Sequence, residues 1–170
     1  MSNPTSSDDL ARRLARLEAI EAIKQLKARY LTACDQKQVE VMRGCFPDET
    51  MVIDYGPVGS FSHRDQLVDL YQKFACNEHV MDIHLGGNPQ IEIIDDNHAR
   101  GSWCLHFFQI HSAAKTVLQL GGYYADEYRR DNGQWVISSS RFQPYATELL
   151  DLEEGLHKIK FVGRQLAKFG

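Results

Sequence analysis

The sequence predicts an α+β domain in which N-terminal helices pack against a strongly curved, mostly antiparallel sheet. The first observation is a helical period, with apolar residues three or four apart from Leu10 to Tyr30. The second is the change after residue 80 to long strand-like runs separated by Gly, Asn and Asp. Helices followed by consecutive strands are typical of this class. Because sheets twist, long strands curl, and helices can then close one face of a cone-shaped barrel.

Three helices are predicted from the apolar period and from capping residues. The first is long, and its Arg and Lys residues lie mostly off the apolar stripe, so these side chains, Lys27 among them, are expected to be solvated. The third follows a capping box from Ser62 to Asp65. The expected ranges are a cap at Ser7 or Asp8 through to residue 35, then 38–45, and then about 63–74.

The strands are predicted from composition and from the turn residues between them. Asn132-Gly133 is the strongest hairpin signal, because both residues tolerate positive φ. Gly86-Gly87 and Gly121-Gly122 match no phosphate-loop motif and favour bends or bulges. The tail, residues 146–170, is expected to be partly helical. The expected strands are 50–55, 80–85, 90–95, 99–111, 116–130 and 134–145.

Length and charge exclude several classes of protein. The 170 residues favour a single domain over 1–170, with its core at about 9–145. Lys and Arg total 19 against 23 Asp and Glu, a net charge of -4, which argues against nucleic-acid binding. No stretch is apolar enough to span a membrane, and no signal-like run opens the chain, so we expect a cytoplasmic protein. The four cysteines form no CxxC pair and are expected to be buried free thiols.

Four polar residues stand where an apolar residue would fit the local pattern. Tyr30 continues the apolar stripe of the first helix, and Asp35 ends that helix little more than one turn later. Tyr55 ends the first strand, and His84 lies within the apolar strand MDIHL. If the helix covers the mouth of the cone, Asp35 and His84 can meet.

Such a meeting would create a metal-free site for proton abstraction. A carboxylate bonded to one imidazole nitrogen fixes the tautomer and leaves the other nitrogen as a base. The hydroxyls of Tyr30 and Tyr55 could hold a substrate oxygen and stabilise negative charge on it. The structural alternative is that Asp35 caps the next helix, that both tyrosines are core residues, and that His84 is only a hydrogen-bonded strand histidine.

Metal binding is not predicted. Among the seven histidines, His106 and His111 are five apart on one expected strand and so point to opposite faces. No HxH or HExxH spacing occurs, and no GxSxG elbow suggests a serine hydrolase. We therefore expect neither a metal nor another cofactor.

Several segments, taken in order from about Leu14 to Tyr145, resemble one family. They are IEAIKQLKARYLTACDQKQ, VIDYGP, MDIHLGGNPQIEI, GSWCLHFFQ and GGYYADEYRRDNGQWVIS. Together they are similar to the SnoaL-like branch of the nuclear transport factor two-like superfamily, and most similar there to the scytalone dehydratase and bile-acid 7α-dehydratase group. The resemblance implies a cone-shaped α+β barrel with an apolar pocket, often paired through the outer face of its sheet.

The resemblance also implies roles for individual residues. In this group, four residues belong to the active site: the tyrosine of ARY, the aspartate of CDQK, the histidine of IHLGG and the tyrosine of IDY. They correspond here to Tyr30, Asp35, His84 and Tyr55. His84 would be the general base, oriented by Asp35. Dehydratases of this group carry a further acid or histidine where Phe107 stands here. His106 lies beside it, on the opposite face unless a bulge turns it inward, and Gln109 is the other candidate.

The expected function is that of a cofactor-independent, dehydratase-like lyase acting on a hydrophobic cyclic, aromatic or steroid-like molecule. Two alternatives remain: a formaldehyde-releasing lyase or isomerase acting on lignin-derived aromatics, and a non-catalytic module for small-molecule binding or dimerisation. A homo-oligomer, dimer or trimer, is expected because a sheet with one face outside the barrel invites pairing. The expected substrate-binding residues are Phe107, Tyr124, Phe142 and His106.

Overall fold

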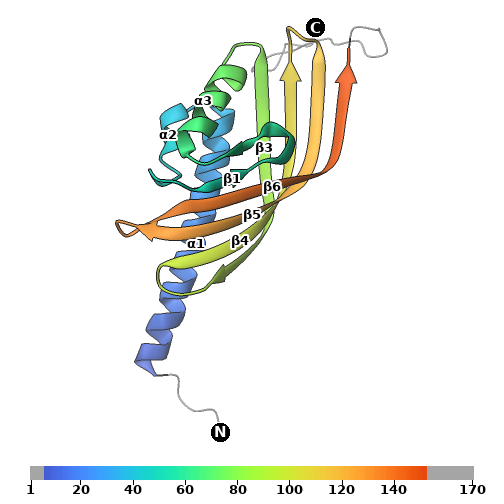
Figure 1. The fold of residues 1–170 in the computed structure, drawn as a ribbon. Coiled ribbons are helices and arrows are strands. Elements are labelled where there is room, and N and C mark those ends of the chain that lie inside the picture. Colours follow the sequence, from blue (N-terminus) through green and yellow to red (C-terminus); the bar gives the residue numbers. More distant parts are fainter. Residues whose placement is uncertain (1–5, 153–170) are drawn as a thin grey trace, which may run out of the picture.

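A computed structural model describes residues 6–152 and shows helices on one face of a curved sheet (Figure 1). This arrangement confirms the predicted α+β class. The helices are α1 (Ser7–Asp35), α2 (Val39–Arg43) and α3 (Arg64–Ala75). The strands are β1 (Val52–Asp54), β2 (Ser60–Phe61), β3 (Val80–Ile93), β4 (His98–His111), β5 (Thr116–Asp131) and β6 (Gln134–Asp151), and a 3-10 turn occupies Gly56–Val58.

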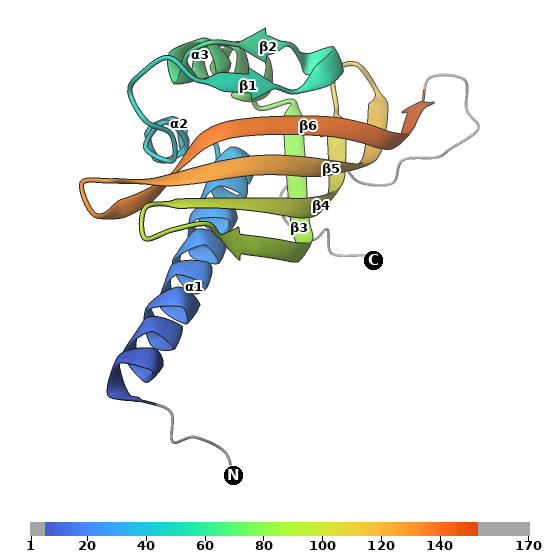
Figure 2. The ribbon, with the colours of Figure 1, turned by 60° about the horizontal axis from the view of Figure 1, so that its bottom comes forward.

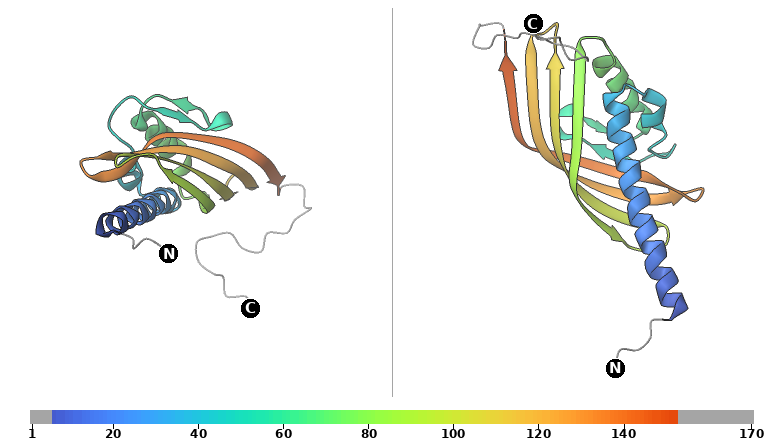
Figure 3. Two further views of the ribbon diagram at one scale, coloured as in Figure 1. Left: turned by 90° about the horizontal axis from the view of Figure 1, so that it is seen from below. Right: turned by 180° about the vertical axis from the view of Figure 1, so that it is seen from behind.

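The strands form one six-stranded sheet in the order β2-β1-β6-β5-β4-β3. Neighbouring strands are antiparallel except β1 and β6, which run parallel. The sheet arches over α1 when it is seen along the helix, so its inner face and the helix enclose the core (Figure 3). A second view shows β3 to β6 bending sharply along their length (Figure 2). This bend gives the sheet its strong curvature.

The bulges predicted at the two glycine pairs are confirmed, but the predicted break between strands 80–85 and 90–95 is wrong. Residues 80–85 and 90–95 were expected as separate strands, whereas β3 is continuous and shifts register between Gly87 and Gln90. Both segments pair with β4, so local turn residues produce a bulge instead of a break. A second shift falls between Gly121 and Gly122 in β5. The Asn132-Gly133 hairpin turn is present, with φ of 49° and 81°.

The first half of α1 differs from its predicted role. Ser6, rather than Ser7 or Asp8, caps the helix by accepting a hydrogen bond from the Asp9 backbone N–H at 3.2 Å. The helix then runs beyond the lower edge of the sheet (Figures 1 and 3). Burial begins only at Ala19. The apolar stripe from residue 10 is therefore uncovered at its start, where the exposed residues are Leu10 (61%), Leu14 (56%) and Leu17 (64%).

Other element boundaries shift by local chemistry. His63, not Ser62, is the N-cap of α3, because its ring accepts a hydrogen bond from the Asp65 backbone N–H. Strand β6 continues to Asp151, so residues 146–151 of the tail that was expected to be partly helical are extended and pair with β5. The remainder of that predicted tail, residues 153–170, lies outside the described residues. No helix of the described part is long and apolar enough to cross a membrane.

A close approach between α1 and β3 places the end of the helix against the middle of the strand. A Cβ atom added to Gly86 would lie 2.6 Å from Leu31 Cδ1, so a larger residue there would require Leu31 or the helix to shift. Leu31 is one helical turn before Asp35, and Gly86 is two residues after His84. The glycine therefore leaves room for Leu31 where α1 meets β3, next to these two polar residues.

Candidate active site

Asp35 and His84, which are 49 residues apart in sequence, are in direct contact. Asp35 Oδ1 lies 2.7 Å from His84 Nδ1, and the His84 backbone N–H donates to Asp35 Oδ1 at 3.0 Å. The side chain of His84 is only 16% exposed and that of Asp35 only 19%, so both are partly shielded from water. In the neutral tautomer favoured by this contact, Nδ1–H donates to the carboxylate and Nε2 is free to accept a proton.

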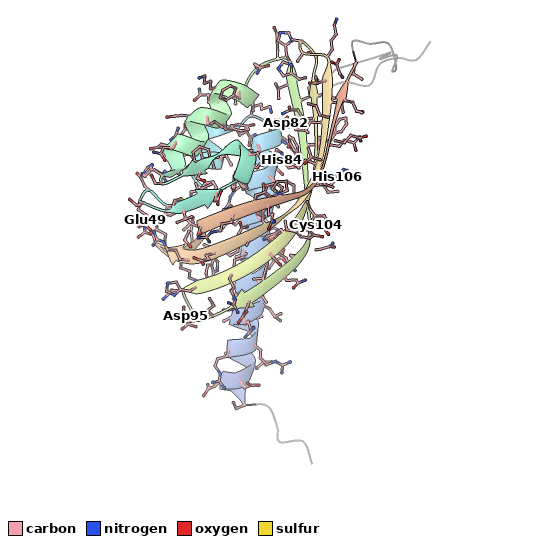
Figure 4. The ribbon with its side chains drawn as sticks, turned by 45° about the vertical axis from the view of Figure 1, so that its right-hand side comes forward. Glu49, Asp82, His84, Asp95, Cys104 and His106 are labelled. Atoms are coloured by element: carbon pink, nitrogen blue, oxygen red, sulfur yellow. The ribbon has the colours of Figure 1, made fainter. Side chains whose placement is uncertain are left out.

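A second ion pair fixes the same end of α1 to β3. Just past the helix, Lys37 adopts a φ of 58° and its ammonium contacts Asp82. Asp82 is two residues before His84 and faces the same side of the sheet (Figure 4). Gln109 donates to the other carboxylate oxygen of Asp82 at 2.9 Å. Gln109 thus supports this ion pair, which in turn holds the segment carrying Asp35 in place.

Three of the predicted substrate-binding residues lie on the inner face of the sheet, and one of them contacts the histidine of the dyad. Phe107 pairs across strands with His84, and their ring centroids are 4.6 Å apart. Tyr124 and Phe142 pair on β5 and β6, with centroids 4.8 Å apart. All three are buried. Apolar rings of this kind form the walls of binding sites for hydrophobic ligands.

His106 does not join them. It is exposed, pairs with Gly121 and points away from the side of the sheet that carries His84 (Figure 4). Strand β4 is regular here, so alternation sends Phe107 inward and His106 outward. The expectation that His106 contacts substrate is corrected accordingly, and no second acid or histidine from β4 stands beside His84.

Tyr30 and Tyr55 form a buried hydroxyl pair. Their phenolic oxygens are 3.0 Å apart. Burial, followed by the neighbouring Tyr55, raises the pKa of Tyr30 well above its usual value. Burial and then the nearby Asp126 carboxylate raise the pKa of Tyr55. Both hydroxyls therefore stay protonated and serve as hydrogen-bonding groups, not as bases.

Lys27 is a functional candidate that the sequence interpretation missed. It is 0% exposed rather than solvated, and its Nζ lies 2.7 Å from Asp126 Oδ2. Ser140 donates to Asp126 Oδ1 at 2.7 Å, and Tyr128 donates to Oδ2 at 2.8 Å. The alternation in GGYYADEY places Asp126 between two inward-facing tyrosines. That pattern was the available signal, because a carboxylate on a buried face needs a charged or hydrogen-bonding partner.

One group within residues 6–152 has metal-ligand geometry, and it lies around the N-terminus of α3. Its members are Asp48, His63 and Asp65. Arg64 contacts Asp48, and Arg43 contacts Asp65. The two arginines already neutralise the carboxylates, so this donor set does not favour a cation.

The chain belongs to the SnoaL-like domain family, whose match covers residues 15–141. Solved structures with the same fold include hexachlorocyclohexane dehydrochlorinase LinA-type3 from Novosphingobium barchaimii. It is 20% identical, with 86% of this chain and 98% of that chain covered and a TM-score of 0.73. A scytalone dehydratase candidate from Novosphingobium aromaticivorans is 18% identical, with 79% and 89% covered and a TM-score of 0.70. A protein described as NTF2-like with a cystatin-like fold, from the same species, is 16% identical, with 82% and 90% covered and a TM-score of 0.68.

Proposed function

We propose that the protein is a cofactor-independent lyase that removes a proton from a small hydrophobic cyclic or aromatic molecule and expels a group from the adjacent carbon. The observation that carries this proposal is the 2.7 Å contact between Asp35 Oδ1 and His84 Nδ1 at a partly shielded position. A dehydrochlorinase and a scytalone dehydratase candidate share the fold, which supports an elimination reaction. A binding module would have no need for this oriented base.

The reaction can be written with the residues present. Nε2 of neutral His84 takes the proton from carbon, and the electron pair of that C–H bond forms the new double bond. The leaving group departs with the electrons of its own bond. Asp35 keeps its hydrogen bond to Nδ1–H and stabilises the imidazolium. Within the Tyr30–Tyr55 pair, one hydroxyl donates to the other, and the proton of the accepting hydroxyl is the one that would hold a substrate oxygen.

Release of water is the preferred outcome. With Phe107 beside the ring of His84, no other acid from β4 is placed to protonate a departing hydroxide. His84 would therefore return its proton from Nε2 to the leaving oxygen, which releases water and regenerates the neutral base. One histidine would thus act first as base and then as acid.

The test uses the full chain and a panel of cyclic β-hydroxy ketones, chlorinated cyclohexanes and lignin-type diaryl alcohols. Conjugated product, chloride and formaldehyde are measured separately. His84→Ala is compared with His98→Ala, because His98 forms a similar contact, 3.0 Å to Asp95, on an exposed turn. We expect His84→Ala alone to reduce turnover at least about 100-fold. Full turnover by His84→Ala would refute the proposal; formaldehyde release or binding without turnover would favour an alternative function.

A further inference from the structure

A buried ion pair lies behind one wall of the site. The Lys27 ammonium, bonded to Asp126, stands 3.4 Å from the centroid of the Tyr124 ring. The same ring packs edge-on against Tyr55, at a centroid distance of 5.8 Å. Because Lys27 is buried, water screens its charge little, and the carboxylate of Asp126 is the counter-charge that keeps the ammonium protonated beside the ring.

The Tyr124 hydroxyl differs from the other hydroxyls nearby. Those of Tyr30 and Tyr55 bond to each other, and that of Tyr128 donates to Asp126. Among residues 6–152, the Tyr124 hydroxyl has no hydrogen-bond partner. It nevertheless keeps some accessible surface, because it is not among the fully buried polar atoms that lack a partner. The hydroxyl therefore borders accessible space with its proton free to donate.

The cation behind the ring strengthens that donor. An ammonium over an aromatic face is attracted to the electron density of the ring and polarises it, so the phenolic hydrogen becomes more positive. Burial keeps the pKa of Tyr124 well above its ordinary value, so the hydroxyl remains protonated. A polarised, fixed hydroxyl of this kind can stabilise negative charge on an oxygen.

The register places Tyr124 on the same inner face of the sheet as His84. His84 pairs with Phe107, which pairs with Leu120 on β5. Leu120 is four residues before Tyr124, so both side chains point to the inner face. The register shift between Gly121 and Gly122 lies between them.

We propose that Tyr124 is a catalytic hydrogen-bond donor to the carbonyl oxygen of the substrate, and that Lys27 is the positioning residue that strengthens it. This rests on the proposed function and narrows its substrate to a conjugated ketone, whose carbonyl oxygen can take up the electron pair. When His84 takes the proton, the electron pair moves through the conjugated system onto that oxygen. It returns from there to form the double bond as the leaving group departs.

The test measures binding of 4-hydroxy-4′-nitrobiphenyl, a two-ring phenol whose phenolate absorbs in the visible. Absorbance titrations at several pH values give separate affinities for phenol and phenolate. Tyr124→Phe keeps the ring over Lys27 and removes only the hydroxyl. Tyr123→Phe is its matched control, because Tyr123 is the next residue on β5 and is 54% exposed on the outer face. For Lys27, the comparison is Lys27→Arg with the double variant Lys27→Met/Asp126→Asn, which leaves no unpaired buried charge.

We expect wild type to prefer phenolate and Tyr124→Phe to bind it at least about 10-fold more weakly, with phenol affinity changed less than about 2-fold. Lys27→Arg should keep most of the preference, and the folded double variant should lose part of it. The proposal is overturned if wild type binds no phenolate, if Tyr124→Phe keeps the preference, or if the double variant matches wild type. These outcomes are independent of turnover: full activity in His84→Ala refutes the lyase, whereas unchanged phenolate binding in Tyr124→Phe refutes only the donor.

Discussion

Asp35 holds His84 at two points, the ring Nδ1 at 2.7 Å and the backbone N–H at 3.0 Å. The double contact fixes both the position of the strand and the rotation of the ring. Asp35 is the last residue of α1, so the helix end and the centre of β3 cannot move independently without breaking it. A ring fixed in this way presents one defined nitrogen to a substrate.

Asp35→Asn should therefore impair catalysis far more than folding. The amide oxygen can still accept from the His84 backbone, but the lost negative charge no longer selects the Nδ1–H tautomer or stabilises the imidazolium. We expect kcat to fall about 10³- to 10⁴-fold, the effect seen when a base loses its orienting carboxylate. Steady-state kinetics and urea unfolding measure the two effects. Asp95→Asn removes the exposed partner of His98 and should keep wild-type kcat; equal losses in both variants would contradict the assignment.

Gly86→Ala should separate the dyad by moving the helix. The added Cβ would meet Leu31 Cδ1 at 2.6 Å, and because Leu31 is only 4% exposed, we expect its side chain to have little room and α1 to shift from β3. Overpacking of this kind lowers the free energy of unfolding by about 1–3 kcal/mol and should also reduce kcat. Gly87→Ala is the matched control, because a Cβ atom added at that neighbouring position would have nothing within 4 Å.

The double variant Gly86→Ala/Leu31→Ala tests the cause of this effect. Shortening Leu31 removes the clash, so kcat should recover even though the lost leucine packing keeps the protein less stable. If kcat stays low after the clash is removed, the close approach is not what aligns Asp35 with His84.

The fold and the dyad could be predicted because both leave local signals. Periodicity and turn residues indicated the elements, and polar residues in apolar runs indicated Asp35 and His84. The apolar stripe that begins at Leu10 was a misleading signal, because it is exposed at its start. A helical period shows which face of a helix is apolar, not whether the sheet extends far enough to cover that face. Lys27 was missed because its partner Asp126 is 99 residues away, and the charge pattern of one helix carries no information on that distance.

The Lys27–Asp126 pair makes a prediction about stability. Lys27→Met would leave the Asp126 carboxylate buried without its cation, so the free energy of unfolding should fall by about 3–5 kcal/mol. Adding Asp126→Asn removes the unpaired charge and should recover much of that loss. Lys24→Met, three residues earlier and 45% exposed, should change stability by less than about 1 kcal/mol. Urea denaturation of these four proteins and of Asp126→Asn alone measures the coupling, and a double variant no more stable than Lys27→Met would contradict the prediction.

Cys34 predicts how stability changes at alkaline pH. Burial raises the pKa of its thiol from 9.0 to about 12, with the adjacent Asp35 carboxylate adding to the shift. Above pH 9 the unfolded chain loses this proton while the native protein keeps it, so the unfolded state is favoured progressively as pH rises to 12. Linkage gives a slope on the order of 1 kcal/mol per pH unit over that window. Urea unfolding at pH 8, 9.5 and 11 should show a shallower decline for Cys34→Ala than for wild type. Cys104→Ala, at a partly exposed position on β4, is the control and should keep the wild-type slope. If Cys34→Ala also keeps the wild-type slope, other buried groups, such as Tyr30, determine how stability declines at alkaline pH.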